Sequence, residues 1–176
     1  MKLNLNQSDL SVDFSGKQLN RLGTDIVSEL RGVKSINLSN NQINKLNSNI
    51  FNRIDALEKD SNQPISLTKI YLNNNDLSFI HSDAFKGLVN LSLLDLSDNQ
   101  LTNLNFNLFN SLINLREIIL RWNNFEKLDP ILFKGLYKLQ LIDLTGNQIN
   151  SINRNHLRNY SEVYDSNNIF KLPILF

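Results

Sequence analysis

Apolar residues return along this chain in one fixed pattern, L-x-x-L-x-L-x-x-N-x-L, in which an asparagine precedes the last apolar position. The central copy is Leu91–Leu101, and the others are Val33–Ile43, Leu67–Leu77, Leu115–Phe125 and Leu139–Ile149. The asparagines are Asn41, Asn75, Asn99, Asn123 and Asn147. Their last three steps share a 24-residue period, and the first step is ten positions longer. A fixed period of this length indicates a protein made of stacked structural repeats.

The two inner apolar residues of each copy alternate with other residues, which is typical of a strand with one buried face. Neighbouring repeats would place these strands about 4.8 Å apart and in the same direction. We expect each recurrent asparagine to bond the turn after the strand through both ends of its amide. A second apolar row, ten positions after each asparagine slot, predicts a stacked core on the opposite side: Val27, Phe51, Phe85, Phe109, Phe133 and Leu157.

The motif and its period resemble those of the leucine-rich repeat family in its 24-residue form, over nearly the whole sequence. This resemblance implies an α/β fold, a right-handed solenoid that forms part of a horseshoe. A parallel β-sheet would line its concave face, and short helical or irregular turns would line its convex face. We expect one domain, residues 1–176.

The repeat boundaries follow from the position of the motif. Residues 1–8 are interpreted as an N-terminal cap strand, and Lys17 takes the asparagine slot of the first repeat. The repeats are predicted at 9–32, 33–66, 67–90, 91–114, 115–138 and 139–162, followed by a degenerate C-terminal repeat at 163–176. The polar segment 58–67 is interpreted as an insert that forms a surface loop. The alternative is that this insert contacts a partner.

Composition and charge narrow the function classes. The chain has 41% hydrophobic and 20% charged residues and a formal net charge of +1, so no global field attracts nucleic acid or anionic lipid. We therefore expect no nucleic-acid partner. No apolar run approaches 18 residues, so we also expect no membrane insertion. Cysteine is absent, which excludes disulfides and thiolate metal sites. With no visible signal peptide, a cytoplasmic location is favoured, or an extracellular one if the chain is a fragment.

No candidate for catalysis stands out. His81 and His156 lie in the return segments and lack a second ligand at metal-binding spacing. Asp95 and Asp143 should lie roughly 10 Å apart, two strands away from each other, near the separation of an inverting glycosidase pair. An open sheet offers little burial to raise the pKa of either carboxyl group, so both are interpreted as surface carboxylates. We therefore expect no enzyme activity, no cofactor and no metal.

The outward columns of the predicted sheet indicate binding instead. The middle and later repeats collect aromatic, aliphatic and arginine side chains, which dominate protein interfaces. The expected partner-binding residues are Lys69, Tyr71, Leu93, Asp95, Glu117, Ile119, Arg121, Trp122, Leu141 and Asp143. Trp122 falls at the edge of this face and not in a core slot. The alternative is that these are scattered surface residues without a common role.

The expected function is a non-catalytic module that binds a protein partner of unknown identity on its concave face. Resemblance to the leucine-rich repeat family points the same way, because its members mostly serve as protein-recognition scaffolds. The alternative is a ligand-recognition fragment of a larger extracellular or membrane-anchored receptor of that family. Self-association of the solenoid is left open.

Overall fold

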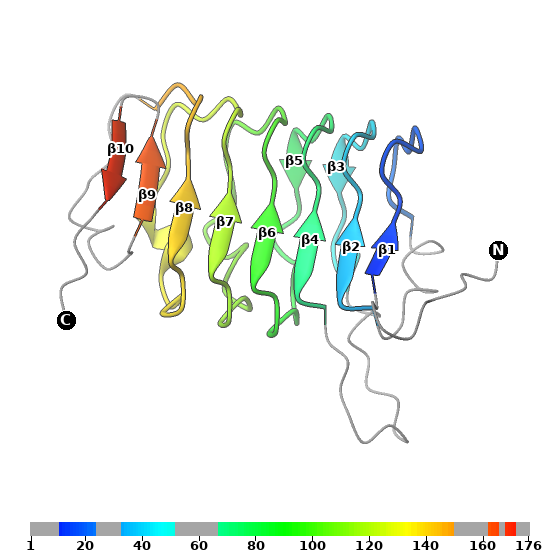
Figure 1. The fold of residues 1–176 in the computed structure, drawn as a ribbon, viewed down its shortest axis with the longest axis horizontal. Helices are drawn as coiled ribbons and strands as arrows, with labels where there is room; N and C mark the ends of the chain where they lie inside the picture. The colour runs from blue at the N-terminus through cyan, green and yellow to red at the C-terminus, as the bar shows by residue number, and fades with distance from the viewer. Residues whose placement is uncertain (1–10, 24–32, 52–66, 150–161, 166–167, 172–176) are drawn as a thin grey trace, which may run out of the picture.

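The strands of this protein form one long ladder (Figure 1). The structure, a computed structural model, describes residues 11–23, 33–51 and 67–149, and the backbone of 162–165 and 168–171. The main sheet has eight strands in the order β1-β2-β4-β6-β7-β8-β9-β10. Their bounds are β1 Ser11–Asp13, β2 Ser35–Asn37, β4 Lys69–Tyr71, β6 Leu93–Asp95, β7 Glu117–Ile119, β8 Leu141–Asp143, β9 Glu162–Asp165 and β10 Asn168–Lys171.

All strands from β1 to β9 pair in parallel, each with the equivalent strand of the next repeat. The central residue of each strand from β1 to β8 is buried between more exposed neighbours, as the alternating pattern predicted: Val12, Ile36, Ile70, Leu94, Ile118 and Ile142. The register joins Ser35 to Lys69 across the longer first step, so the ten extra positions leave the pairing unchanged. The predicted parallel solenoid is confirmed.

The recurrent asparagines connect each turn to the repeat before it. Asn99 Nδ2 donates to the carbonyl oxygens of Leu96 (3.1 Å) and Ser97 (2.9 Å) in its own turn, and to Leu72 (3.0 Å) one repeat earlier. Its Oδ1 accepts from the backbone N–H of Leu77 at 2.9 Å. Equivalent bonds are made by Asn41, Asn75, Asn123 and Asn147. The predicted use of both amide ends is confirmed.

Phenylalanine rings fill the core beneath the return segments. Phe51, Phe85, Phe109 and Phe133 are fully buried. The ring centroids of Phe51 and Phe85 are 5.9 Å apart, and those of Phe109 and Phe133 are 6.2 Å apart, both pairs being stacked. The predicted apolar row is thus confirmed for these four residues, while Val27 and Leu157 lie outside the described residues.

The return segments contain little regular structure. A 3-10 helix, η1 (Pro130–Phe133), begins after Asp129, whose Oδ1 accepts from the backbone N–H of Ile131 at 3.0 Å. Two short strands, β3 (Lys45–Leu46) and β5 (Phe79–Ile80), pair in parallel as a second sheet that the sequence did not predict. In the part of the chain that the structure describes, no helix is long and apolar enough to cross a membrane.

Two features lie at predicted boundaries of the repeats. Leu67, counted both as the end of the surface insert and as the first apolar position of its repeat, is fully buried. The remainder of the insert, like the proposed cap strand 1–8, lies outside the described residues. Within the segment predicted as a degenerate repeat, β9 adds one more parallel strand and β10 then pairs antiparallel with β9.

Candidate binding face of the sheet

The strands bring eight of the ten candidate binding residues into two adjacent rows. Strand pairing aligns one row along Lys69, Leu93, Glu117 and Leu141, and the other along Tyr71, Asp95, Ile119 and Asp143. Arg121 and Trp122 follow shortly after β7. We call these ten residues the concave patch. Six of them are half-buried, whereas Lys69, Glu117, Arg121 and Trp122 are exposed.

The carboxylates of the patch are held by the turns that follow their strands. Asp95 Oδ1 accepts from the backbone N–H of Ser97 at 3.0 Å and from its hydroxyl at 2.7 Å. Asp143 Oδ1 accepts from the backbone N–H of Thr145 at 3.0 Å. Each of these aspartates therefore closes the end of its own strand as well as lining the sheet face.

Asp13 occupies the equivalent place in the first repeat, and its environment alters its acidity. Hydrogen bonds from the hydroxyl and the backbone N–H of Ser15, the latter 2.8 Å long, lower the pKa of Asp13 below its ordinary value. The positive charge of Lys17 adds a smaller effect in the same direction. Donors that stabilise the ionised form of a carboxyl group lower its pKa.

Trp122 adopts a backbone conformation that its residue type disfavours. Its φ is +53°, in the left-handed region, and its side chain is 57% exposed. The equivalent residues of the other repeats also have positive φ, but they are glycine, asparagine or aspartate: Gly16, Asn40, Asn74, Asp98 and Gly146. Those types adopt this conformation at little cost, whereas a bulky residue is strained by it.

The indole of Trp122 extends over the next repeat. A Cβ atom placed on Gly146 would lie 2.5 Å from Cδ2 and 2.9 Å from Cζ3 of the indole, and would also meet Cε3. Glycine at position 146 therefore makes room for the ring. The residue types at positions 122 and 146 therefore depend on each other, because the indole of Trp122 can lie there only while position 146 is glycine. Trp122 is the one tryptophan of the chain.

The turns at the two edges of the sheet differ in charge in the repeats that carry β4, β6, β7 and β8. We define the start edge as residues 86–92, 110–116 and 134–140, which lead into β6, β7 and β8. Its charged residues are all cations, namely Lys86, Arg116, Lys134 and Lys138. We define the end edge as residues 74–76, 98–100, 122–124 and 146–148, whose charged residues are Asp76 and Asp98. The first repeat departs from this pattern, because its equivalent end-edge position holds the cation Lys17. Sequence reasoning missed the local difference because it considered only the total charge.

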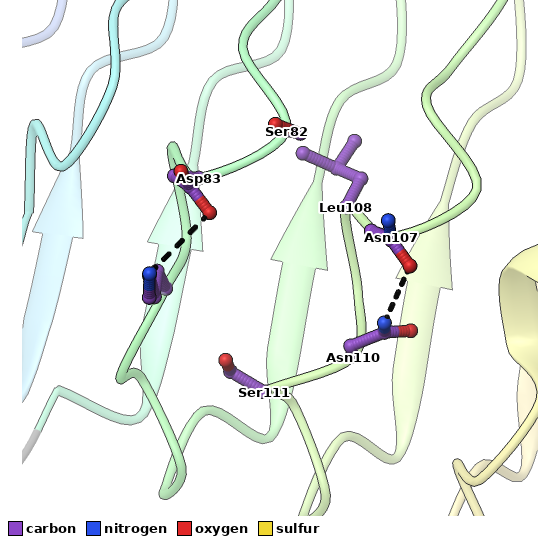
Figure 2. Close-up of a pocket in the computed structure, with 7 residues that line it drawn as sticks. Ser82, Asp83, Asn107, Leu108, Asn110 and Ser111 are labelled. Atoms are coloured by element: carbon purple, nitrogen blue, oxygen red, sulfur yellow. Dashed lines mark hydrogen bonds and ion pairs between the residues drawn. The ribbon is translucent and has the colours of Figure 1, made fainter.

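A polar hollow lies between two return segments, on the side opposite the sheet (Figure 2). It measures about 360 Å³ and is lined by Ser82, Asp83, Lys86, Asn107, Leu108, Asn110 and Ser111. Within it, Lys86 Nζ lies 3.8 Å from Asp83 Oδ1, and Asn110 Nδ2 donates to Asn107 Oδ1 at 2.8 Å. Both members of the ion pair are substantially exposed, so the hollow offers no buried reactive group.

The histidines considered as metal ligands do not form a site in the described residues. His81 Nδ1 accepts from the backbone N–H of Asp83 at 3.0 Å, which places its ring in the local turn. His156 lies outside the part of the chain with a described structure. No group of three His, Cys, Asp or Glu residues within that part could hold a metal ion.

The Leucine rich repeat family matches residues 65–125 and 113–163, which together span more than half of the chain. The chain belongs to this family. It is 39% identical over 80 residues to Chaoptin of Drosophila melanogaster, covering 45% of this chain and 6% of Chaoptin. It is 53% identical over 36 residues to human Toll-like receptor 8, covering 20% of this chain and 4% of the receptor. The chain thus spans a small fraction of both relatives.

Solved structures share the same architecture. The chain superposes on the protein of the TLR13–ssRNA13 complex with a TM-score of 0.69 and 28% identity, covering 80% of this chain and 18% of that one. The superposition on the Toll–Spatzle complex from Drosophila has a TM-score of 0.64 and 22% identity, covering 74% of this chain and 16% of that one. The superposition on the leucine-rich repeat domain of APL1B has a TM-score of 0.66 and 19% identity, covering 78% of this chain and 38% of that one. The last two likenesses concern the fold alone.

Proposed function

We propose that this chain is a non-catalytic recognition module that holds a protein partner on the concave patch, with Tyr71, Ile119, Arg121 and Trp122 at its centre. The observation that carries this proposal is Trp122, which is exposed although its conformation is strained. Strained residues cluster at functional sites, since stability alone gives no reason to retain them. Tryptophan, tyrosine and arginine are also the residues that contribute most binding energy at protein interfaces.

The charges of the patch favour a protein over a nucleic acid. The patch carries two cations, Lys69 and Arg121, and three carboxylates, Asp95, Glu117 and Asp143. A polyphosphate backbone requires a surplus of cations, which these residues do not supply. The RNA named with TLR13 belongs to that protein, and this patch lacks the charge to hold a similar ligand.

A second proposal keeps the same face but places it in a larger extracellular or membrane-anchored receptor. Its support is the similarity to Toll-like receptor 8 and Chaoptin, of which the chain spans only 4% and 6%. The absence of cysteine supports the cytoplasmic location of the first proposal instead. The intact mass of the native protein separates the two. A mass near 20.3 kDa favours the small cytoplasmic module, and a larger mass favours the receptor.

Photo-crosslinking tests where the partner binds. A photoreactive residue at position 119, on the patch, should capture one protein from cells of the natural source. The same residue at position 103, which is exposed in a return segment, serves as the matched control and should not. An excess of unlabelled protein should compete with capture, and an excess of the Trp122→Asn variant should compete about tenfold less well. Equal capture from both positions would refute the concave site.

The single tryptophan gives a second readout. Once the captured partner is purified, its addition should shift the Trp122 emission to shorter wavelength, because the interface removes water from the half-exposed ring. An unchanged emission at saturating partner would place the contact away from Trp122.

A further inference from the structure

The turns of the start edge carry a row of exposed apolar side chains. Val89, Ile113 and Tyr137 occupy equivalent positions of successive repeats, each four positions before the first pairing residue of its strand, and are 42%, 53% and 95% exposed. We call these three residues the apolar row. The turns lie side by side at the ends where β6, β7 and β8 begin (Figure 1).

Side-chain contacts keep these turns together. Asn114 Nδ2 donates to the carbonyl oxygen of Val89 at 2.8 Å, and Lys138 Nζ donates to Asn114 Oδ1. The two bonds join three successive repeats. They connect the segments that carry the apolar row.

Cations predominate in the turns that carry the row, although Glu117 follows Arg116 directly and Asp83 pairs with Lys86. Lys86, Arg116, Lys134 and Lys138 are exposed, and residues 86–92, 110–116 and 134–140 contain no Asp or Glu. Lys86 lies 3.8 Å from Asp83, and Lys138 bonds only a neutral amide. Within the described residues, Arg116 and Lys134 form no ion pair.

We propose that the start edge is a second binding surface, which takes an acidic protein segment that also carries apolar side chains. The carboxylates of such a segment would pair with the four cations, and its apolar side chains would cover Val89, Ile113 and Tyr137. Charge complementarity of this kind steers association and fixes the alignment of the partner. None of these residues belongs to the concave patch, so this proposal does not depend on the first.

Two other occupants fit the edge less well. A second copy presenting the same edge would bring four cations against four, which is repulsive. A membrane would gain little, because Val89 and Ile113 are already half-covered by their own turns.

Fluorescence anisotropy with labelled polymers tests the proposal on the full chain. The probe is a random copolymer of glutamate and tyrosine, and poly-glutamate is the charge-only comparison. The protein should bind the copolymer at least about tenfold more tightly than poly-glutamate. Its affinity for the copolymer should fall as the salt concentration is raised. The Ile113→Thr/Tyr137→Thr variant should lose about tenfold in copolymer affinity. The Phe79→Thr/Phe106→Thr control removes two exposed apolar side chains outside the start edge and should change affinity by less than about twofold.

Charge variants complete the design. The Lys134→Gln/Lys138→Gln variant should also lose about tenfold, and its control, Lys45→Gln/Lys127→Gln, should not. Trp122 emission should stay unchanged when the copolymer binds. Equal affinity for poly-glutamate, equal losses in the controls, or no copolymer binding would overturn the proposal. A shift in Trp122 emission would overturn it too, because it would assign the probe to the concave patch. Binding to phosphatidylserine vesicles, without copolymer binding, would identify a membrane surface instead.

Discussion

The indole ring of Trp122 occupies the space in which any side chain at position 146 would begin. Gly146 itself has a φ of +75°, so two features act against other residues there: the left-handed backbone disfavours most of them, and the ring leaves no room for a side chain. Trp122 has a left-handed backbone of its own. The pair therefore combines a tryptophan whose backbone conformation is strained with a glycine that leaves room for the indole ring.

Replacement of this glycine should be costly for two separable reasons. Gly146→Ala should lower the free energy of unfolding by about 1–2 kcal/mol through the left-handed backbone alone, and by more because the indole must move. Urea denaturation followed by circular dichroism measures the loss. The double variant Gly146→Ala/Trp122→Asn should retain only the backbone cost. If the two substitutions were additive, ring and glycine would not be coupled.

Removal of the indole should spare the fold. Trp122→Asn introduces a residue type that already occupies this position at Asn40 and Asn74, and it relieves a strained backbone. We expect unfolding free energy to stay within about 0.5 kcal/mol or to rise, while partner binding weakens. Thermal denaturation checks the first part. A drop of several degrees would show that Trp122 belongs to the core and would contradict its proposed role.

The asparagine ladder should be sensitive to a single substitution. Asn99→Ala removes four buried hydrogen bonds and leaves the Leu77 N–H and nearby carbonyls without this partner. Each unsatisfied buried group costs about 1–3 kcal/mol, so we expect a loss of at least about 3 kcal/mol in chemical denaturation. Asn103→Ala is the matched control, since Asn103 is exposed and bonds only Thr102. Equal effects at both positions would contradict the ladder's role.

Two phenylalanines of one return segment provide a test of core packing. Phe109 is fully buried and stacks on Phe133, whereas Phe106 is 57% exposed. Phe109→Ala should cost about 3–5 kcal/mol, as is usual for a core phenylalanine. Phe106→Ala should cost less than about 1 kcal/mol. A comparison of the two urea midpoints at equal slopes decides the question.

The acidity of Asp13 can be measured by an NMR titration of its carboxyl group. Its pKa should lie below 3.8, its ordinary value, and Ser15→Ala should move the pKa upward by removing the hydroxyl donor. Because the folded-state pKa is the lower one, Asp13 stabilises the fold above its unfolded pKa. This contribution is lost as pH falls through the folded-state pKa. An unchanged pKa in Ser15→Ala would assign the shift to the backbone donor and Lys17.

Much of the architecture could be predicted because one motif encodes the strands, their pairing and the turns that follow them. Period-2 alternation predicted the strands, the 24-residue step predicted their parallel register, and Asn99 and its equivalents predicted the ladder. The C-terminal hairpin was not foreseen because the step there changes. Leu141 pairs with Glu162, which lies three positions before the residue that a full 24-residue step would reach. No periodic pattern in the sequence indicates that β10 runs in the opposite direction.

The edges were harder to predict than the sheet face. In a strand, alternate residues point outward, so the patch could be named by position. In the turns, no two-residue alternation shows which side chain is exposed: Leu88 is buried and its equally apolar neighbour Val89 is exposed. The strain at Trp122 was equally hidden, since a tryptophan carries no sign of a left-handed backbone. Only comparison with Asn74, Asp98 and Gly146 in the same column points to it.

The four cations of the start edge lie in the turns of three successive repeats. The field of such charges acts over roughly 10 Å at moderate salt, which is further than any direct contact. Under the proposal for this edge, an acidic segment would therefore be attracted before its apolar side chains meet the apolar row, although the chain as a whole is almost neutral.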